Sequence, residues 1–328
     1  MEITPERDSR QSASQRAVHN TVYSKEEDKM IDLHMHSRYS NDGEFAPSAL
    51  VETCAERGID TMSVTDHNCV RACAEAMSAA VKCGIVCLPG TEIDCTYSGV
   101  HFHLLGYGID CASPDFDKIE HAVRAQGPAA SLQMLEKTRA MGFRIDEAQM
   151  QELARDSYWP ETWTGELFAE VLLSRPDDAD HPLLMPYRAG GERGDNPQAN
   201  FYWDFYAQGK PCYAEMRYPA MEEVIDLIHR NGGAAVLAHP LVNINGNRDL
   251  LDGVIGLGID GIEAYSSYHS PAQAVGLAME AKRRGLFFTC GSDYHGRTKP
   301  SVFPGEHGGA AEDVMRAQLE KLFRKITK

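Results

Sequence analysis

Positive charge is scarce in this sequence. Its 328 residues include 32 Lys and Arg against 48 Asp and Glu, which gives a formal net charge of −16. Nucleic-acid polymers and anionic membranes attract proteins through basic surfaces, so this balance argues against both as partners. The length and the ordinary apolar fraction allow one large domain or two smaller ones.

The sequence also lacks a Cys-x2-Cys pair of the kind that structural zinc sites use, and its nine cysteines are an odd number. We expect them to be small buried side chains in a reducing cytoplasm. Residues 1–29 contain no apolar segment that could act as a signal peptide or a membrane anchor. We therefore predict a flexible tail at 1–29 and a cytoplasmic protein.

What the sequence has instead is a series of His, Asp and Glu residues near the ends of predicted strands. The segments are Asp32-Leu33-His34-Met35-His36-Ser37, Asp42-Gly43, Thr65-Asp66-His67, Gly90-Thr91-Glu92, His103-Leu104-Leu105-Gly106, Ala238-His239-Pro240 and Gly291-Ser292-Asp293-Tyr294-His295. Alternate residues of a strand point the same way, so His34 and His36 present two imidazoles to one side. Nitrogen and oxygen ligands together suit Mn, Zn or Fe(II). Because no cysteine takes part, we expect an open site with room for water and substrate.

Helices and strands alternate along much of the chain. The pattern predicts helices at 47–57, 72–82 and 221–230, and strands at 59–64, 85–88, 234–237, 261–265 and 286–290. Such alternation indicates a parallel sheet. In an α/β barrel, ligands gather at the carboxyl ends of the strands, and every segment above except the one with His34 and His36 comes just past a predicted strand.

These motifs resemble those of the PHP (polymerase and histidinol phosphatase) phosphoesterases, over roughly residues 31–110 and 220–298. The similarity rests on the segment 32–37, on Ser63-Val64-Thr65-Asp66-His67-Asn68 and on Gly291-Ser292-Asp293. It implies an α/β fold, a distorted barrel of seven βα units with an inserted, mainly helical cap. We place the barrel at 30–110 and 220–300, the cap at 111–219 and a C-terminal helix at 301–328, with Val314, Leu319 and Leu322 on its apolar face.

The resemblance also implies a set of metal ligands. One ion would be held by His34, His36, Glu92 and Asp293, and Glu92 would bridge to a second held by His103 and His239. A third would take Asp42, His67 and His295. We expect three divalent ions, with Mn first and Zn or Fe as alternatives. Asn41 is inserted ahead of Asp42 relative to the family pattern, and we choose Asp42 because a carboxylate binds a divalent cation better than an amide does.

Substrate contacts are predicted on both sides of the pocket. By resemblance, His269 reaches the phosphate or protonates the leaving oxygen, and it is predicted together with Asp293 as a catalytic residue. Arg38, Lys210 and Arg217 are candidate phosphate ligands, each with the alternative of a solvated surface cation. Asp66 is expected to orient a ligand from behind.

The predicted cap departs from its relatives. Related caps choose the substrate through an Arg and a His ahead of a Phe-Ala pair, and the matching stretch here, Gly165-Glu166-Leu167-Phe168-Ala169, contains neither. The aromatic residues Tyr202, Trp203, Phe205 and Tyr206 could stack a base, but their spacing is more typical of a packed helix core.

We expect a metal-dependent phosphoesterase that acts on a small phosphorylated sugar or nucleotide. By resemblance, the substrate is a cyclic phosphodiester, ribose 1,2-cyclic phosphate 5-phosphate, cleaved in two successive steps by a metal-bridging hydroxide. A nucleoside 3′,5′-bisphosphate phosphatase and a histidinol-phosphate phosphatase are the enzymatic alternatives. A noncatalytic PHP module is the alternative from another class, which the retention of nine ligands disfavours. The partner would be a small anionic phosphoester, with no nucleic-acid polymer and no membrane.

Overall fold

The computed structural model describes residues 30–178, 180–309 and 311–327, so the tail predicted at 1–29 lies outside the described residues. Seven strands form one sheet in chain order. They are β1 (Met30–Asp32), β2 (Ile59–Val64), β3 (Val86–Tyr97), β4 (Val100–Tyr107), β5 (Ala234–Leu237), β6 (Gly261–Ser266) and β7 (Phe287–Gly291).

The sheet curves round until its two edges meet. The backbone N–H of Leu33, just after β1, donates to the carbonyl of Cys290 in β7 at 3.0 Å, and the N–H of Asp293 donates to His34 at 2.8 Å. The predicted distorted barrel of seven strands is thereby confirmed. The expected all-parallel pairing is wrong for one strand, because β4 runs antiparallel to both β3 and β5. The tight turn at Ser98-Gly99, where both residues have positive φ, returns the chain directly beside β3.

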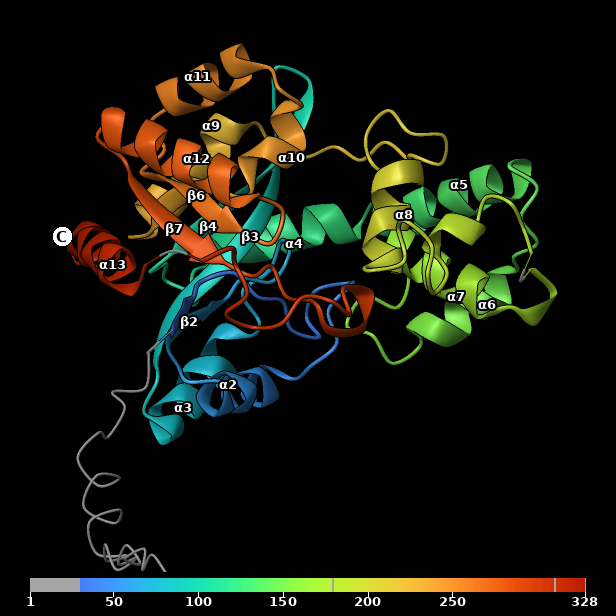
Figure 1. Cartoon of the computed structure of the whole chain (residues 1–328), viewed down its shortest axis with the longest axis horizontal. Helices are drawn as coiled ribbons and strands as arrows, with labels where there is room; N and C mark the ends of the chain where they lie inside the picture. The colour runs from blue at the N-terminus through green and yellow to red at the C-terminus, as the bar shows by residue number, and fades with distance from the viewer. Residues whose placement is uncertain (1–29, 179, 310, 328) are drawn as a thin grey trace, which may run out of the picture.

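Helices cover the outside of the barrel (Figure 1). The helices α2 (Pro47–Glu56) and α3 (Cys73–Cys83) lie beside β2 and β3, whereas α9 (Met221–Arg230), α10 (Pro240–Ile244), α11 (Arg248–Gly256) and α12 (Pro271–Arg283) lie on the opposite side. The last helix, α13 (Glu312–Ile326), buries Met315, Leu319 and Leu322 against the barrel. Val314, predicted on that apolar face, is instead 40% exposed because its position on the helix turns it outward.

The segment between β4 and α9 forms a lobe beside the barrel (Figure 1). Its helices are α5 (Gly127–Ala140), α6 (Glu147–Ala154), α7 (Gly165–Ser174) and α8 (Pro197–Phe205), with short 3-10 turns at Pro176–Asp178 and Met185–Tyr187. They enclose a second hydrophobic cluster that includes Leu135, Phe168 and Phe201. The helix before them, α4 (Pro114–Arg124), packs its Phe116 into the barrel core instead. The boundaries of 111 and 219 for a separate cap stay a prediction.

In the part of the chain that the structure describes, no helix is both long enough and apolar enough to cross a lipid bilayer.

Replacement of a barrel core side chain tests this packing. Phe102 on β4 is fully buried in the main cluster, so Phe102→Ala should lower the free energy of unfolding by about 3–5 kcal/mol. Val81→Ala is the control, because Val81 is 82% exposed and its loss should change stability by less than about 0.5 kcal/mol. Urea denaturation followed by circular dichroism measures both, and equal midpoints would contradict the assigned core.

Candidate metal centre

The structure brings all nine residues predicted as metal ligands into one buried cluster. Their ligand atoms fall into overlapping groups, in each of which the atoms lie within 4.8 Å of one another: His34, His36, Glu92 and Asp293; His36, Asp42, His67 and His295; Glu92, His103 and His239; and His67, Asp94 and His103. Three of the nine differ from the expected placement just past a strand, because Glu92 lies inside β3, His103 lies inside β4, and Asp42 lies in the loop between β1 and α2.

His34 and His36 lie on the extended segment after β1, which bridges to Tyr294 through Met35. Their Nε2 atoms face each other at 3.1 Å. The outward nitrogen of each ring is already engaged: Nδ1 of His34 lies 2.9 Å from the Glu263 carboxylate, and Nδ1 of His36 lies 2.9 Å from the Ser40 hydroxyl. A neutral histidine that donates from Nδ1 carries a lone pair on Nε2, so the two Nε2 atoms point lone pairs at a common point.

Two carboxylates aim at the same point. Glu92 Oε2 lies 3.1 Å from both Nε2 atoms, and Asp293 Oδ1 lies 3.2 Å from that of His34 and 3.0 Å from that of His36. Burial alone would lower the pKa of His34, but Glu92, Glu263 and Asp293 together raise it well above its ordinary value. The four side chains together therefore attract a cation strongly.

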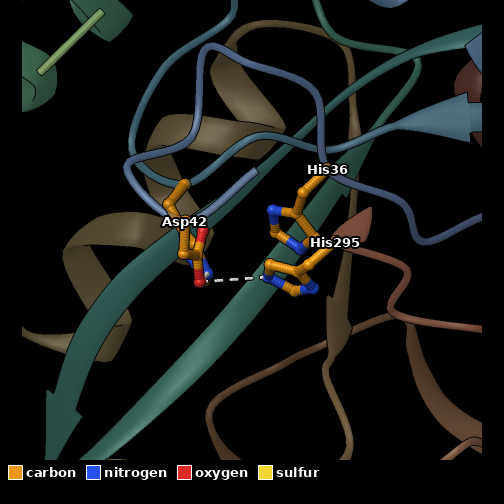
Figure 2. Close-up of side chains that lie close together, drawn as sticks. His36, Asp42 and His295 are labelled. Atoms are coloured by element: carbon orange, nitrogen blue, oxygen red, sulfur yellow. Dashed lines mark ion pairs between the residues drawn. The ribbon is translucent and has the colours of Figure 1, made fainter. Parts of the chain in front are cut away.

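Figure 2 shows how Asp42 joins His36 and His295 from separate segments of the chain. Asp42 Oδ2 lies 3.2 Å from Nε2 of His295 and 3.9 Å from Nε2 of His67. The loop can turn this tightly because of Gly43, where an added Cβ would lie 2.0 Å from the Ser37 carbonyl oxygen. Although burial opposes it, His295 pulls the pKa of Asp42 well below its usual range. Asp42 rather than the inserted Asn41 stays the predicted ligand.

The third part of the cluster joins Glu92 of β3, His103 of β4 and His239, which follows β5 by two residues. Glu92 Oε1 lies 2.9 Å from Nδ1 of His103 and 3.1 Å from Nε2 of His239. His103 also has Asp94 opposite it across the antiparallel pair, with Oδ1 of Asp94 2.9 Å from its Nε2. The β4 reversal thus delivers His103 to a cluster otherwise built from parallel strands.

The arrangement of these atoms fits divalent metal ions. Buried atoms that accept no hydrogen bond include Oε2 of Glu92, Oδ1 of Asp293, Oδ1 of Asp42 and Nδ1 of His67. Leaving such atoms unsatisfied costs free energy unless a cation occupies the space between them. Ligand atoms bound at roughly 2.0–2.1 Å to one ion lie about 3 Å apart, which matches the separations given above. The nitrogen and carboxylate donors suit Mn, Zn or Fe(II).

Residues outside the nine support the cluster, and one of them, Glu263, was not selected from the sequence. Glu263 on β6 accepts from both His34 and the backbone N–H of His239, the latter at 2.8 Å. The sequence feature that could have identified Glu263 is its place in an otherwise apolar strand, where an unpaired carboxylate costs free energy. Asp66, expected to orient a ligand, accepts from Ser37 and Ser40 and so acts on His36 through the Ser40 hydroxyl. Burial raises the pKa of Asp66 to about 6.

A cavity opens above the cluster and is walled on its far side by α5, α7 and α8. Its volume is about 170 Å³. Lys299 lines this cavity, although no sequence motif points to this residue. Its Nζ lies 2.5 Å from Oδ2 of Asp293 and 4.2 Å from the centre of the Tyr268 ring. Burial opposes its charge, but Asp293 raises the pKa of Lys299 above its ordinary value, so it remains a cation.

The predicted phosphate ligands do not line this cavity. Lys210 and Arg217 are exposed, and Arg38 lies in a separate hollow with Arg297. His269 is buried, its Nδ1 contacts the Ala264 carbonyl at 2.9 Å, and it faces another depression beyond β6. His269 was predicted by resemblance, Arg38 by its spacing from His36, and Lys210 and Arg217 as basic residues of the cap. None of these grounds fixes the turn of a loop or the side of a strand.

The cap aromatics divide between two roles. Tyr202, Trp203 and Tyr206 line the cavity, while Tyr206 also belongs to the second hydrophobic cluster and Tyr202 and Phe205 pack against it. The expected packed helix core is thus correct for Tyr202, Phe205 and Tyr206.

The sequence is similar to known proteins across most of its length. The PHP domain pattern matches residues 32–168. A 3′,5′-nucleoside bisphosphate phosphatase of Chromobacterium violaceum is 30% identical over 295 residues, covering 87% of this chain and 92% of the relative. A phosphoribosyl 1,2-cyclic phosphate 1,2-diphosphodiesterase of Eggerthella lenta is 27% identical over 269 residues, covering 81% and 94%.

Two further similarities bear on the site. A 5′-3′ exoribonuclease of Escherichia coli is 29% identical over 275 residues, covering 81% of this chain and 85% of the relative. A solved structure of an amidohydrolase from Chromobacterium violaceum, with bound sulfate and no metal, superposes with a TM-score of 0.72 at 26% identity and covers 90% of this chain and 96% of that one.

The role of Glu263 can be tested directly. In Glu263→Gln the amide cannot accept from both His34 and His239, so affinity for Mn²⁺ should fall by about 10- to 100-fold. Calorimetric titration of metal-free protein measures it. Glu136→Gln, an exposed substitution on α5, is the matched control and should bind as the unmodified protein does. Equal affinity in both variants would show that Glu263 does not support the cluster.

Proposed function

Because this chain belongs to the PHP domain family and is a metal-dependent phosphoesterase, we propose that it hydrolyses a small phosphorylated sugar or nucleoside and that cyclic phosphodiesters are among its substrates. The observation that carries the proposal is the overlap of the ligand groups. His36 and Glu92 each belong to two groups, so the ion positions would be adjacent. Adjacent positive centres suit the several oxygens of one phosphoryl group.

The proposed ligand sets follow the groups in the structure. His34, His36, Glu92 and Asp293 would hold one ion, and Glu92, His103 and His239 a second. Asp42, His67 and His295 would hold a third. We propose Mn²⁺ for all three positions, with Zn²⁺ and Fe²⁺ as alternatives that the same donors accept. Bound ions of this kind lower the pKa of a coordinated water and polarise phosphoryl oxygens.

The protein's own residues would orient the reaction. Glu263 and Ser40 fix the ring orientation and tautomer of His34 and His36, which keeps their Nε2 lone pairs directed at Glu92 and Asp293. Lys299 balances the charge of Asp293 and adds a permanent positive charge to the cavity wall. Water would attack phosphorus, the phosphorus–oxygen ester bond would break, and the leaving oxygen would take up a proton.

A cyclic phosphodiester is the proposed substrate, with ribose 1,2-cyclic phosphate 5-phosphate as the specific candidate. Opening of its ring leaves a monoester on the same sugar, and the same cluster could hydrolyse that monoester in a second step without a change of site. The similarity to the Eggerthella lenta diphosphodiesterase, over nearly all of that protein, supports this choice.

A nucleoside 3′,5′-bisphosphate is the second candidate. It is favoured by the Chromobacterium violaceum relative and by Tyr202 and Trp203, whose rings line the cavity and could stack a base. The absence of Arg and His from the stretch 165–169 counts against it. The acidic balance favours both small substrates over an RNA polymer, although a relative is named an exoribonuclease. All nine cysteines are free thiols, which supports the proposal of a cytoplasmic location.

Time-resolved phosphorus NMR of manganese-loaded protein distinguishes these substrates. With ribose 1,2-cyclic phosphate 5-phosphate, the cyclic signal should give way to a monoester and then to inorganic phosphate. Parallel samples hold adenosine 3′,5′-bisphosphate, histidinol phosphate and a short 5′-phosphorylated RNA. If the cyclic signal persists while another of these compounds is hydrolysed, that other compound becomes the assigned substrate.

A single ligand substitution tests the catalytic assignment. Asp293→Asn removes the charge of a carboxylate that contacts His34, His36 and Lys299. Loss of several kcal/mol of transition-state stabilisation should lower kcat/KM by at least about 100-fold. Phosphate release measured alongside metal content separates lost metal from lost rate. Unchanged phosphate release would remove Asp293 from the reaction.

A further inference from the structure

The cavity wall formed by α7 carries a buried acidic side chain. Glu166 lies in the first turn of α7, lines the cavity and is only 8% exposed. It makes no ion pair with any described residue, and the donors beside it are the Thr164 hydroxyl and its own backbone N–H. A buried carboxylate normally has a cation or several donors from other residues beside it. Among the described residues, no Lys or Arg pairs with Glu166.

The position of Glu166 is fixed by packing on both sides of α7. Gly165 lies so close to α8 that an added Cβ would come 2.8 Å from the Tyr206 side chain. One turn after Glu166, Glu170 pairs with Arg297 at 3.0 Å, and Arg297 follows His295 by two residues. Residues four apart lie on the same face of a helix. Glu166 and Glu170 therefore both face the loop that carries His295 and Arg297. The carboxylate is therefore placed beside the Asp42 and His295 group.

The charges around the cavity limit what can bind Glu166. Among the described residues that line the cavity, Lys299 is the only Lys or Arg, and Asp293 already engages it. The negative charge of Asp42 acts on the same part of the wall. A second phosphate at this wall would meet a like charge. A hydrogen-bond donor on the ligand would supply what the protein does not.

We propose that Glu166 is a specificity-determining residue that accepts a hydrogen bond from the sugar hydroxyl next to the reacting phosphoryl group. This inference rests on the proposed function, because the groups beside the phosphoryl of a sugar or nucleoside phosphoester are hydroxyls. A substrate without that hydroxyl leaves the carboxylate buried and unpaired, so it is rejected.

Matched pairs of substrates that differ by one hydroxyl test the inference. The first pair is ribose 1,2-cyclic phosphate 5-phosphate and its 3-deoxy analogue, and the second is adenosine 3′,5′-bisphosphate and its 2′-deoxy analogue. For the unmodified manganese-loaded protein, kcat/KM should favour the hydroxyl-bearing member of a hydrolysed pair by about 10- to 100-fold. In Glu166→Ala this ratio should fall to nearly 1, and in Glu166→Gln, which keeps a weaker neutral acceptor, it should be intermediate.

The ratio separates recognition from a general loss of activity. A structural defect in Glu166→Ala would slow both members of a pair equally and leave their ratio unchanged, and that result would overturn the inference. The Gln variant is close in shape and guards against misfolding of the Ala variant. Glu136→Gln should keep the ratio of the unmodified protein. If the unmodified protein hydrolyses neither pair, the proposed function fails, and the inference fails with it.

Discussion

The structure depends on one electrostatic constraint, which is the convergence of histidine lone pairs and carboxylate oxygens on common points. The Nε2 atoms of His34 and His36 face Glu92 and Asp293 at 3.0–3.2 Å while the far side of each ring is already hydrogen-bonded. In a buried site, such an arrangement is stable only with added positive charge. The barrel places these atoms, and the bound cations would in turn hold the strand ends together.

The backbone around the cluster is strained in the way that this constraint requires. Asn68, His239 and Asp293 all have positive φ, which a side-chain-bearing residue adopts at a cost of about 1–3 kcal/mol. His239 and Asp293 are members of the ligand groups, and Asn68 donates to Asp94 beside His103. Strain is thus concentrated where strands end and side chains must turn inward. The hydrophobic cores of the barrel and of the lobe at α5–α8 supply the stability that maintains it.

Prediction from the sequence succeeded where residue type and local spacing decide the outcome. The His-x-His of residues 34–36 and the Asp-x-His of residues 293–295 bring paired ligands to one side of an extended chain, whatever follows them. It failed where long-range packing decides. Nothing local shows that β5 pairs antiparallel with β4, that Glu263 supports two histidines, or that His269 lines a separate depression. Val314 and Met315 differ by a single residue, and only docking of α13 selects which one is buried.

The sequence by itself determined the donor types of the cluster, which are nitrogen and oxygen without cysteine, and its alternating helices and strands determined a sheet covered by helices. The closure of that sheet into a barrel was expected only from the family resemblance. The tertiary structure alone decided what surrounds those donors. Lys299 and Glu166 reach the cavity from segments whose local patterns predict only a surface loop and a helix start. Their positions follow from the contact of α7 with the loop after His295, which joins residues more than one hundred positions apart. Contacts at such separation depend on the packing of the whole chain and have no local signature.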